Sequence, residues 1–277
     1  MRDATCLITG GSGGIGAAAA AGIAARGMRV VLVGRDPARS DAAAAAIRRR
    51  LPAANVDVLI ADLALLAETR ALAAEVIGRY PDLRVLVLNA AVARPRRELT
   101  AEGFERDLAT NHLAPFLLAR LLTEHLAANA PARIVPVTSS VHARVKTVDP
   151  EASFSQTRTY ATTKLLNLLA MTELDRRLGG TGVTVNAADP GFAHTGLGRD
   201  TTGAFGLFLK LSRPLQKSAE RAAAPIVRLA TDPELVDTSG AYFTAKGAVA
   251  PSPTACDPAL AHQVWTWTVA QTTPHPA

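Results

Sequence analysis

An apolar run that ends in a glycine-rich turn opens the chain, and it constrains the fold more than any other feature. Residues 4–8 read ATCLI, residues 9–16 read TGGSGGIG, and an alanine-rich stretch follows. Glycine allows backbone conformations and close approaches that other residues resist. Where such a turn links a strand to a helix, the free N–H groups at the helix start favour a pyrophosphate. The opening segment therefore predicts a dinucleotide-binding site.

Two glycine spacings fit this turn. The pattern G-x-G-x-x-G begins at Gly11, the pattern T-G-x-x-x-G-x-G begins at Thr9, and both end at Gly16. The alternative is a turn that holds no ligand. It is poorly motivated, because so many glycines would destabilise a loop that had nothing to bind.

Short apolar runs alternate with helical stretches along the rest of the 277 residues. The candidate strands are Ala4–Thr9, Arg29–Val33, Asp57–Ala61, Val85–Leu88, Arg133–Thr138, Thr184–Ala188 and Ala241–Phe243. The candidate helices are Gly14–Ala25, Arg39–Leu51, Ala64–Tyr80, Gly103–Asn129, Thr157–Leu178 and Ser218–Thr231. Continuous apolar strands that alternate with helices are typical of a parallel sheet covered on both faces. We therefore expect an α/β fold: a single Rossmann-type doubly wound domain over residues 1–277, with a seven-stranded, mostly parallel sheet and helices on both faces.

Two long segments interrupt this alternation. Residues 141–156 follow the fifth strand and residues 192–217 follow the sixth. Loops at the carboxyl ends of parallel strands are where substrate sites are usually built. The second segment combines glycines with large apolar residues, which predicts a lid over a hydrophobic ligand or, alternatively, a helix packed in the core. Residues 250–277 form a C-terminal extension of the same domain.

Composition and charge exclude several classes of partner. The net charge is +6, but aromatic residues make up only 4%, and the arginine clusters at 48–50 and 94–97 are not interleaved with aromatics. We expect solvated arginines and no nucleic-acid partner. The sequence contains no run of 18 apolar residues, so we expect no membrane span. The first residues do not resemble a signal peptide. The two cysteines do not indicate a disulfide framework, so we expect a cytoplasmic protein.

The end of the second strand bears on the identity of the dinucleotide. Asp36 lies about as far from the glycines as the acidic residue that binds the ribose 2′-hydroxyl of NAD. The position nearest the ribose is predicted to be Gly34, and Arg35 then offers a planar cation to a 2′-phosphate. This favours NADP over NAD. In the loop itself Ser12 and Gly13 are neutral, so the preference is not expected to be strict.

A second motif lies in the other half of the chain. Residues 160–164 read YATTK, which places Tyr160 and Lys164 on one face of a helix. The fifth strand ends in Ser139 and Ser140, and Asn111 lies in the preceding helix. Each of these features alone would be an ordinary surface pair or turn. Together with the glycine turn, and in this order, they indicate a catalytic site.

With both motifs in view, the chain resembles the short-chain dehydrogenase/reductase family from about residue 4 to about residue 245. The resemblance implies that Tyr160 is the general acid/base, and that Lys164 lowers the pKa of Tyr160 and binds the ribose next to nicotinamide. It implies that Ser140, the second serine of its pair, holds the substrate oxygen, and that Asn111 orders a water between Lys164 and solvent.

The same resemblance implies the residues that contact the two ligands. The cofactor-binding set is Gly10, Ser12, Gly13, Gly14, Ile15, Gly16, Arg35, Asp62, Leu63, Asn89, Ala90, Ala91, Asn111, Tyr160, Lys164, Pro190, Gly191, Phe192 and Thr195. Ala91 departs from the family pattern, which has glycine there. The substrate set is Ser140, His142, Tyr160 and Phe192. Metal binding by His112, His142 or His194 is not expected, because no Cys, Asp or Glu stands at ligand spacing.

A narrower resemblance is to the retinol dehydrogenase-like and WW-domain oxidoreductase-like branch. It rests on GFERDLATNHLAPFLLARLL, on the long gap between Ser140 and Tyr160, and on SGAYF and DPALAHQVWTW near the end. It implies an NADP-dependent carbonyl reductase or alcohol dehydrogenase for a hydrophobic aldehyde, ketone or alcohol. The alternatives are an epimerase or dehydratase without net redox turnover, and a dinucleotide-sensing binding protein, which would not need Tyr160 or Lys164.

The helix that carries YATTK has more leucine than one buried stripe requires. The surplus residues are Leu165, Leu166, Leu168 and Leu169. In the family such a face forms homodimers or homotetramers, and deep packing within one chain is the alternative. The substrate, the direction of the reaction and the pathway are not predicted by the sequence.

Overall fold

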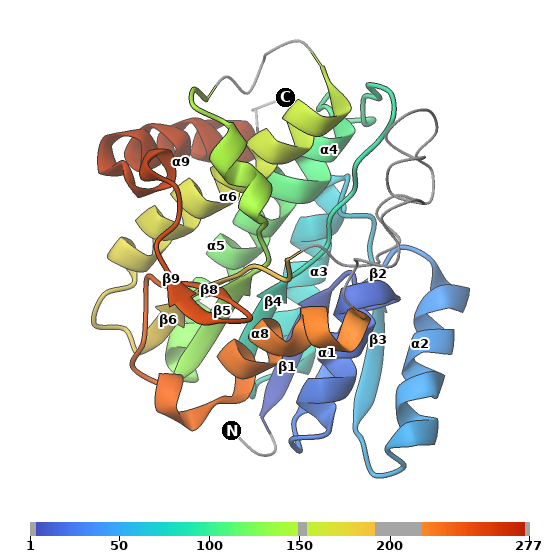
Figure 1. The fold of residues 1–277 in the computed structure, drawn as a ribbon. Helices are drawn as coiled ribbons and strands as arrows, with labels where there is room; N and C mark the ends of the chain where they lie inside the picture. The colour runs from blue at the N-terminus through green and yellow to red at the C-terminus, as the bar shows by residue number, and fades with distance from the viewer. Residues whose placement is uncertain (1–3, 149–153, 192–217, 275–277) are drawn as a thin grey trace.

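The computed structural model describes residues 4–148, 154–191 and 218–274. Its centre is a parallel sheet of β1 (Thr5–Thr9), β2 (Arg29–Gly34), β3 (Val56–Ile60), β4 (Leu83–Leu88), β5 (Ala132–Pro136) and β6 (Val183–Val185). The strand order is β3-β2-β1-β4-β5-β6 (Figure 1). The order reverses between β1 and β4, and a doubly wound sheet binds its ligand at such a point. The expected doubly wound α/β fold is confirmed.

Helices cover both faces of this sheet. The helices are α1 (Gly14–Ala24), α2 (Pro37–Arg50), α3 (Leu66–Arg79), α4 (Arg106–Leu108), α5 (Ala114–Ala128), α6 (Gln156–Arg177), α8 (Ala219–Thr231) and α9 (Pro258–Thr272). One apolar core lies between the sheet and α1, α2 and α8, and the other lies between the sheet and α3, α5 and α6 (Figure 1). Short 3₁₀ turns occur at Ser140–Arg144, Pro233–Leu235 and Pro253–Cys256.

The expected seventh strand does not join the main sheet. Instead β8 (Tyr242–Thr244) lies in a small second sheet between β7 (Ala187–Ala188) and β9 (Gly247–Val249). The division occurs at Asn186, whose amide donates to Thr238 O at 2.6 Å and accepts from Ala241 N–H at 3.1 Å. These side-chain bonds bend the chain, so the single strand expected over 184–188 becomes β6 and β7, and β8 pairs with β7.

The expected helix over 103–129 is also divided. It begins as α4, passes through a π-helical turn at Ala109–Leu113 and continues as α5. Single π-turns inside helices are frequent at functional sites. This one contains Asn111 and His112.

The C-terminal helix α9 packs along α6 (Figure 1). The leucines of α6 at 165, 166, 168 and 169 are each 5% exposed or less. The ring of Trp265 meets Phe116 of α5 edge-on, with centroids 4.9 Å apart, and the guanidinium of Arg177 lies 4.6 Å from the centre of the Trp265 ring. The leucine surplus is therefore packed within this chain. Among the described residues, no helix has both the length and the apolarity needed to cross a bilayer.

Candidate active site

The glycine turn between β1 and α1 is built around two close approaches. A Cβ on Gly16 would lie 2.3 Å from Gly10 O and 2.5 Å from Asn89 Nδ2, so only glycine fits this position. Gly10 and Gly14 have φ of 68° and 54°, a region that side chains disfavour. The turn thus keeps its backbone open at the start of α1, as a pyrophosphate requires. Of the expected cofactor residues, Ser12, Gly13, Gly14 and Ile15 are partly exposed along this turn.

The segment after β4 is tied to the same turn. Asn89 donates from Nδ2 to Thr9 O at 2.8 Å, and Thr9 Oγ1 accepts from the N–H groups of Asn89 and Ala90. Ala91 follows and is half-buried. After β3, Asp62 accepts from Ala64 N–H at 3.0 Å and its Oδ2 lies 3.6 Å from Arg106 Nη1. Leu63, next to it, is buried. These residues line the carboxyl edge where a dinucleotide is expected.

The end of β2 presents two arginines. Arg35 is exposed, and a Cβ on Gly13 would lie only 3.5 Å from Arg39 Nη2. Asp36, the residue that would favour NAD, is instead the N-cap of α2 and accepts from Arg39 N–H at 3.1 Å. The glycine loop itself carries no basic residue, but Arg39 reaches that loop from the first turn of α2, which the sequence pattern did not predict. Arg39 lies three residues after the N-cap Asp36, and this position in the first turn of α2 could have indicated a side chain near the glycine loop.

Tyr160 and Lys164 lie one turn apart on α6. Lys164 is 2% exposed, its Nζ donates to Val137 O at 3.0 Å, and the same nitrogen lies 5.4 Å from the centre of the Tyr160 ring. Burial lowers the pKa of Lys164 to about 8, and the carboxylate of Asp189 acts in the opposite direction. At neutral pH the side chain is therefore an ammonium, held beside the phenol.

The expected lowering of the Tyr160 pKa is not what the protein alone produces. Burial raises the pKa of Tyr160, and the carboxylates of Asp189 and Asp107 raise it further. Burial is the larger cause of the raised pKa, and the two carboxylates, at the end of β7 and on α4, add to it. A phenol in this environment is protonated at neutral pH, which suits donation of its proton to a carbonyl oxygen.

The two serines that follow β5 have different surroundings. Ser139 is the N-cap of the turn at Ser140–Arg144, and its Oγ accepts from Val141 N–H at 3.5 Å. Ser140 is exposed at the start of that turn, which packs against α6. Ser140 is therefore the more exposed of the two serines, and its contact with the substrate oxygen stays a prediction.

His142 is not placed to meet a substrate, as was expected of it. It is 3% exposed, its Nδ1 lies 2.8 Å from Ser139 O, and its Nε2 accepts from Ser252 N–H at 3.1 Å. Both ring nitrogens are thus engaged with the backbone, in a neutral imidazole that donates from Nδ1. Its partner Ser252 lies 110 residues away, so sequence spacing gave no signal of this role.

Asn111 lies in the π-turn and is completely buried. Its Oδ1 accepts from Val92 N–H at 2.7 Å, and its Nδ2 donates to Val92 O at 2.8 Å. Its own carbonyl accepts from Asn167 Nδ2 at 2.7 Å. The side chain therefore holds the segment after Ala91 in place. Its Oδ1 and the backbone carbonyl oxygen each accept one of these bonds, so each retains a lone pair for the water that is expected there.

The turn after β7 supplies the last described part of the site. Pro190 is buried and Gly191 has φ of 72°. Gly191 N–H donates to Asp189 Oδ1 at 2.7 Å. The predictions for Phe192, His194, Thr195 and the lid at 192–217 lie outside the described residues.

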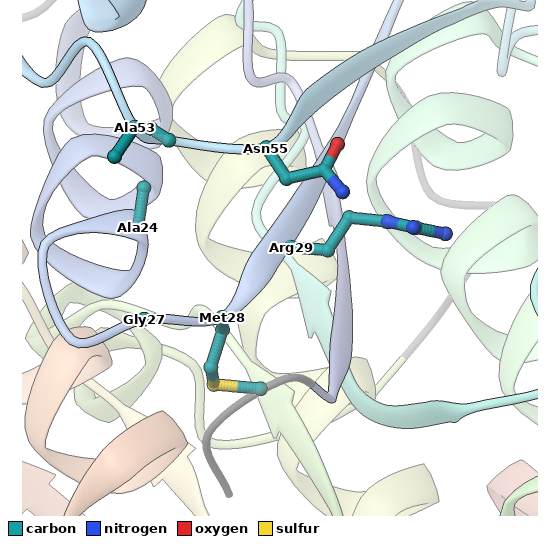
Figure 2. A pocket seen from close by; sticks show the side chains of 7 residues that line it. Ala24, Gly27, Met28, Arg29, Ala53 and Asn55 are labelled. Carbon is teal, nitrogen blue, oxygen red and sulfur yellow. The ribbon is translucent and has the colours of Figure 1, made fainter.

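A separate hollow of about 200 Å³ lies at the opposite edge of the sheet (Figure 2). It is formed where α1 leads into β2 and where the chain enters β3, and Arg29 and Asn55 project beside it. None of the predicted catalytic, cofactor-binding or substrate residues lines it. We therefore do not connect this hollow with the chemistry of Tyr160.

Comparison with known proteins agrees with this arrangement. The family profile described as short chain dehydrogenase matches residues 4–204. The chain belongs to the short-chain dehydrogenase/reductase family. It is accordingly an NAD(P)-dependent oxidoreductase, and a catalytic role for the tyrosine of Tyr-x-x-x-Lys is typical of that family.

Two curated relatives show its place within the short-chain dehydrogenases. Retinol dehydrogenase 13 of Homo sapiens is 39% identical over 272 residues, which cover 94% of this chain and 82% of that protein. The WW domain-containing oxidoreductase of Danio rerio is 36% identical over 278 residues, which cover 96% of this chain and 67% of that protein. The chain thus lies in the retinol dehydrogenase-like branch, as predicted.

A solved structure agrees with the fold. A short chain dehydrogenase from Burkholderia cenocepacia J2315, crystallised in complex with NADP, has a TM-score of 0.71 to this chain and 26% sequence identity. The match covers 92% of this chain and 98% of the other.

Proposed function

We propose that this protein transfers a hydride between NADP and a hydrophobic aldehyde, ketone or alcohol, with Tyr160 as general acid/base. The observation that supports this most directly is the placement of Lys164. Its buried ammonium bonds to the last carbonyl before the Thr138–Ser140 segment and faces the Tyr160 ring. The turn that begins at the exposed Ser140 packs against α6, which carries Tyr160 and Lys164, and this supports one site that combines an acid, a cation and a serine.

The roles of the chain's own groups follow from their chemistry. Bound NADP would supply or accept the hydride. Ser140 would donate a hydrogen bond to the substrate oxygen and orient it, and Tyr160 would give its proton to that oxygen during reduction. Lys164 would stabilise the phenolate that remains and bind ribose hydroxyls. The glycine turn, with Asp62 and the segment at 89–91, would hold the adenosine and diphosphate.

The preference for NADP is supported by charge. Arg35 and Arg39 both flank the end of β2, and Asp36 is engaged as a helix cap. Guanidinium groups suit a phosphate monoester because they offer paired donors in one plane. The Burkholderia relative was crystallised with NADP, which agrees with this preference.

The choice of a hydrophobic substrate is supported by relatives whose names specify retinol dehydrogenase activity. The apolar segment at 192–217 agrees with it. A cytoplasmic location and a homodimer or homotetramer remain predictions, and a dimer would need a surface other than the leucines of α6.

Replacement of Tyr160 by Phe tests the proposal. We expect kcat to fall by about three orders of magnitude or more while NADPH binding persists, because the substitution removes the proton donor of the transition state but leaves the glycine turn and Lys164 to bind the cofactor. Turnover should be followed as NADPH absorbance over a panel of hydrophobic aldehydes and ketones. Product formation without loss of NADPH absorbance would favour an epimerase or dehydratase, and full biological activity of the Phe variant would favour a sensing protein.

A further inference from the structure

Asp189 is a buried carboxylate that the roles described so far leave unexplained. It is 3% exposed and stands between β7 and the Pro190–Gly191 turn. Its Oδ2 accepts from the hydroxyl of Tyr242 at 2.7 Å, and its Oδ1 accepts from Gly191 N–H at 2.7 Å. Its own N–H donates to Phe243 O at 2.7 Å. A buried carboxylate is costly unless it is hydrogen-bonded, and here both oxygens have a donor.

The register of the strands brings Asp189 close to the catalytic lysine. Ala188 forms a parallel bridge with Val137, and Thr138 N–H donates to Ala188 O at 2.9 Å. Val137 O is the acceptor of the Lys164 ammonium. Asp189 therefore directly follows Ala188, which pairs with Val137, the residue whose carbonyl binds Lys164.

Asp189 also joins the two loops that flank the substrate position. Its partner Tyr242 meets the ring of His142 edge-on, with centroids 5.5 Å apart. His142 in turn bonds to Ser139 O. One cluster thus connects the turn beside Gly191 with the backbone next to Ser140.

We propose that Asp189 is a positioning residue of the active site, which fixes the Pro190–Gly191 turn through one oxygen and serves as the buried counter-charge of Lys164. Tyr242 anchors the carboxylate. This inference depends on the proposed function only for the expected effect on kcat, because the charges of Asp189 and Lys164 interact in the cofactor-free protein as well.

The sign of the effect follows from the groups that face Lys164 and Tyr160. Asp189, at the end of β7, acts on both side chains, and Asp107 of α4 acts on Tyr160. Loss of the Asp189 charge removes an attraction for the ammonium, so the pKa of Lys164 should fall further below its ordinary value. It also removes a repulsion on the phenolate, so the pKa of Tyr160 should fall as well.

The test is a titration of Lys164 in the cofactor-free protein. The chain has five lysines, so a sample with ¹³C-labelled lysine gives few Cε signals, and Lys164→Arg assigns the one that belongs to the site. A lysine in water titrates near pH 10.4, well above the pKa of Lys164. The variants are Asp189→Asn and Asp189→Ser, each of which keeps an oxygen for Gly191 N–H and removes the charge.

In both Asp189 variants we expect the titration midpoint of Lys164 to lie roughly one pH unit lower than in the wild type. The pH profile of kcat should move in the same direction. Tyr242→Phe, which keeps the charge, should change the Lys164 titration far less. Asp175→Asn is the control, because Asp175 lies on α6 about three turns beyond Lys164. An unchanged Lys164 titration in a folded Asp189 variant would overturn the proposal, even if Tyr160→Phe behaves as expected. A shifted titration in a protein without redox activity would leave it standing and refute the proposed function instead.

Discussion

The imidazole of His112 lies 2.9 Å from Thr268 Oγ1, so the residue next to Asn111 contacts the last helix of the chain. Its other nitrogen lies 3.0 Å from Asn167 Oδ1, and Asn167 Nδ2 donates to Asn111 O. All four side chains are buried, and burial lowers the pKa of His112 to about 4. Because Asn167 presents its oxygen to the ring, the neutral imidazole donates from Nδ1, and its Nε2 shares the single Thr268 hydroxyl proton with Val264 O, which lies 2.7 Å from that hydroxyl. Helix α9 thus supports the π-turn of the active site.

Thr268→Val tests this support. The substitution keeps the shape of the side chain but leaves His112 Nε2 without a donor in a buried position, so we expect a loss of about 1–3 kcal/mol in the free energy of unfolding. We also expect a lower kcat, because the π-turn that holds Asn111 is released. Thr266→Val is the matched control, since Thr266 lies on the same helix and is exposed. Urea denaturation and steady-state kinetics should separate the two variants, and equal behaviour would contradict the link.

The glycine turn predicts the outcome of a paired alanine experiment. Gly16→Ala places a methyl group 2.3 Å from a backbone oxygen, so we expect it to destabilise the protein by more than about 2 kcal/mol and to abolish NADPH binding. Gly78→Ala on α3 has no atom within 4 Å of the new methyl group and should stabilise by about 0.5–1 kcal/mol. Thermal denaturation and fluorescence titration with NADPH measure both effects. Normal cofactor affinity in the Gly16 variant would show that the turn does not hold the diphosphate.

Arg35 and Arg39 should set the cofactor preference together. We expect Arg35→Gln and Arg39→Gln each to weaken the binding of NADPH by about 1–2 kcal/mol and to change the binding of NADH little, because only NADPH carries the 2′-phosphate. Arg49→Gln, on the last turn of α2, is the control for general charge. The measurement is the dissociation constant of each cofactor for each variant. An equal loss of affinity for NADPH and NADH would contradict the assignment of NADP as the cofactor.

The parallel sheet, the glycine turn and the Tyr160–Lys164 pair could be predicted because each depends on local spacing. The position of β8 could not, since it depends on hydrogen bonds from Asn186 to Thr238 and Ala241, more than 50 residues away. A pattern of apolar residues identifies a strand but not the neighbour it pairs with.

The site shows the same division. Arg39 and His142 were misjudged because their contacts come from the tertiary structure: Arg39 turns back to Gly13, and His142 is held by Ser252. The pKa of Tyr160 in the free protein is raised first by burial and then by Asp189 and Asp107, which are remote in sequence, so local spacing could not predict it. The leucines of α6 left two interpretations open, and only the position of α9 distinguishes them.

The two serines after β5 should differ in function. Ser140→Ala should lower kcat by about 10²-fold or more, since it removes a donor to the reacting oxygen. Ser139→Ala removes the N-cap of the following turn and should mainly lower stability, by about 1 kcal/mol, with kcat little changed. Kinetics and urea denaturation of both variants test this, and the reverse ranking in kcat would transfer the catalytic role to Ser139.

Glu173 should couple stability to acid pH. Its carboxylate is 4% exposed, accepts hydrogen bonds from Arg176 and Arg177, and lies 3.6 Å from His262 of α9. The bond from Arg176 lowers the pKa of Glu173 to about 2. An unfolded glutamate titrates near 4.3, so the stabilisation is complete above that pH and is lost as the pH falls toward 2. The arginines are largely exposed, so we expect Glu173→Gln to cost only about 1 kcal/mol at pH 7.

That difference from the wild type should shrink as the pH falls below about 4, because the wild-type carboxylate then becomes protonated as well. Glu75→Gln removes an exposed pair with Arg79 and should have no measurable effect at either pH. The measurement is the urea midpoint of the three proteins at pH 7 and at pH 3. If Glu173→Gln loses as much stability at pH 3 as at pH 7, Glu173 stabilises the contact between α6 and α9 by packing and not by its charge.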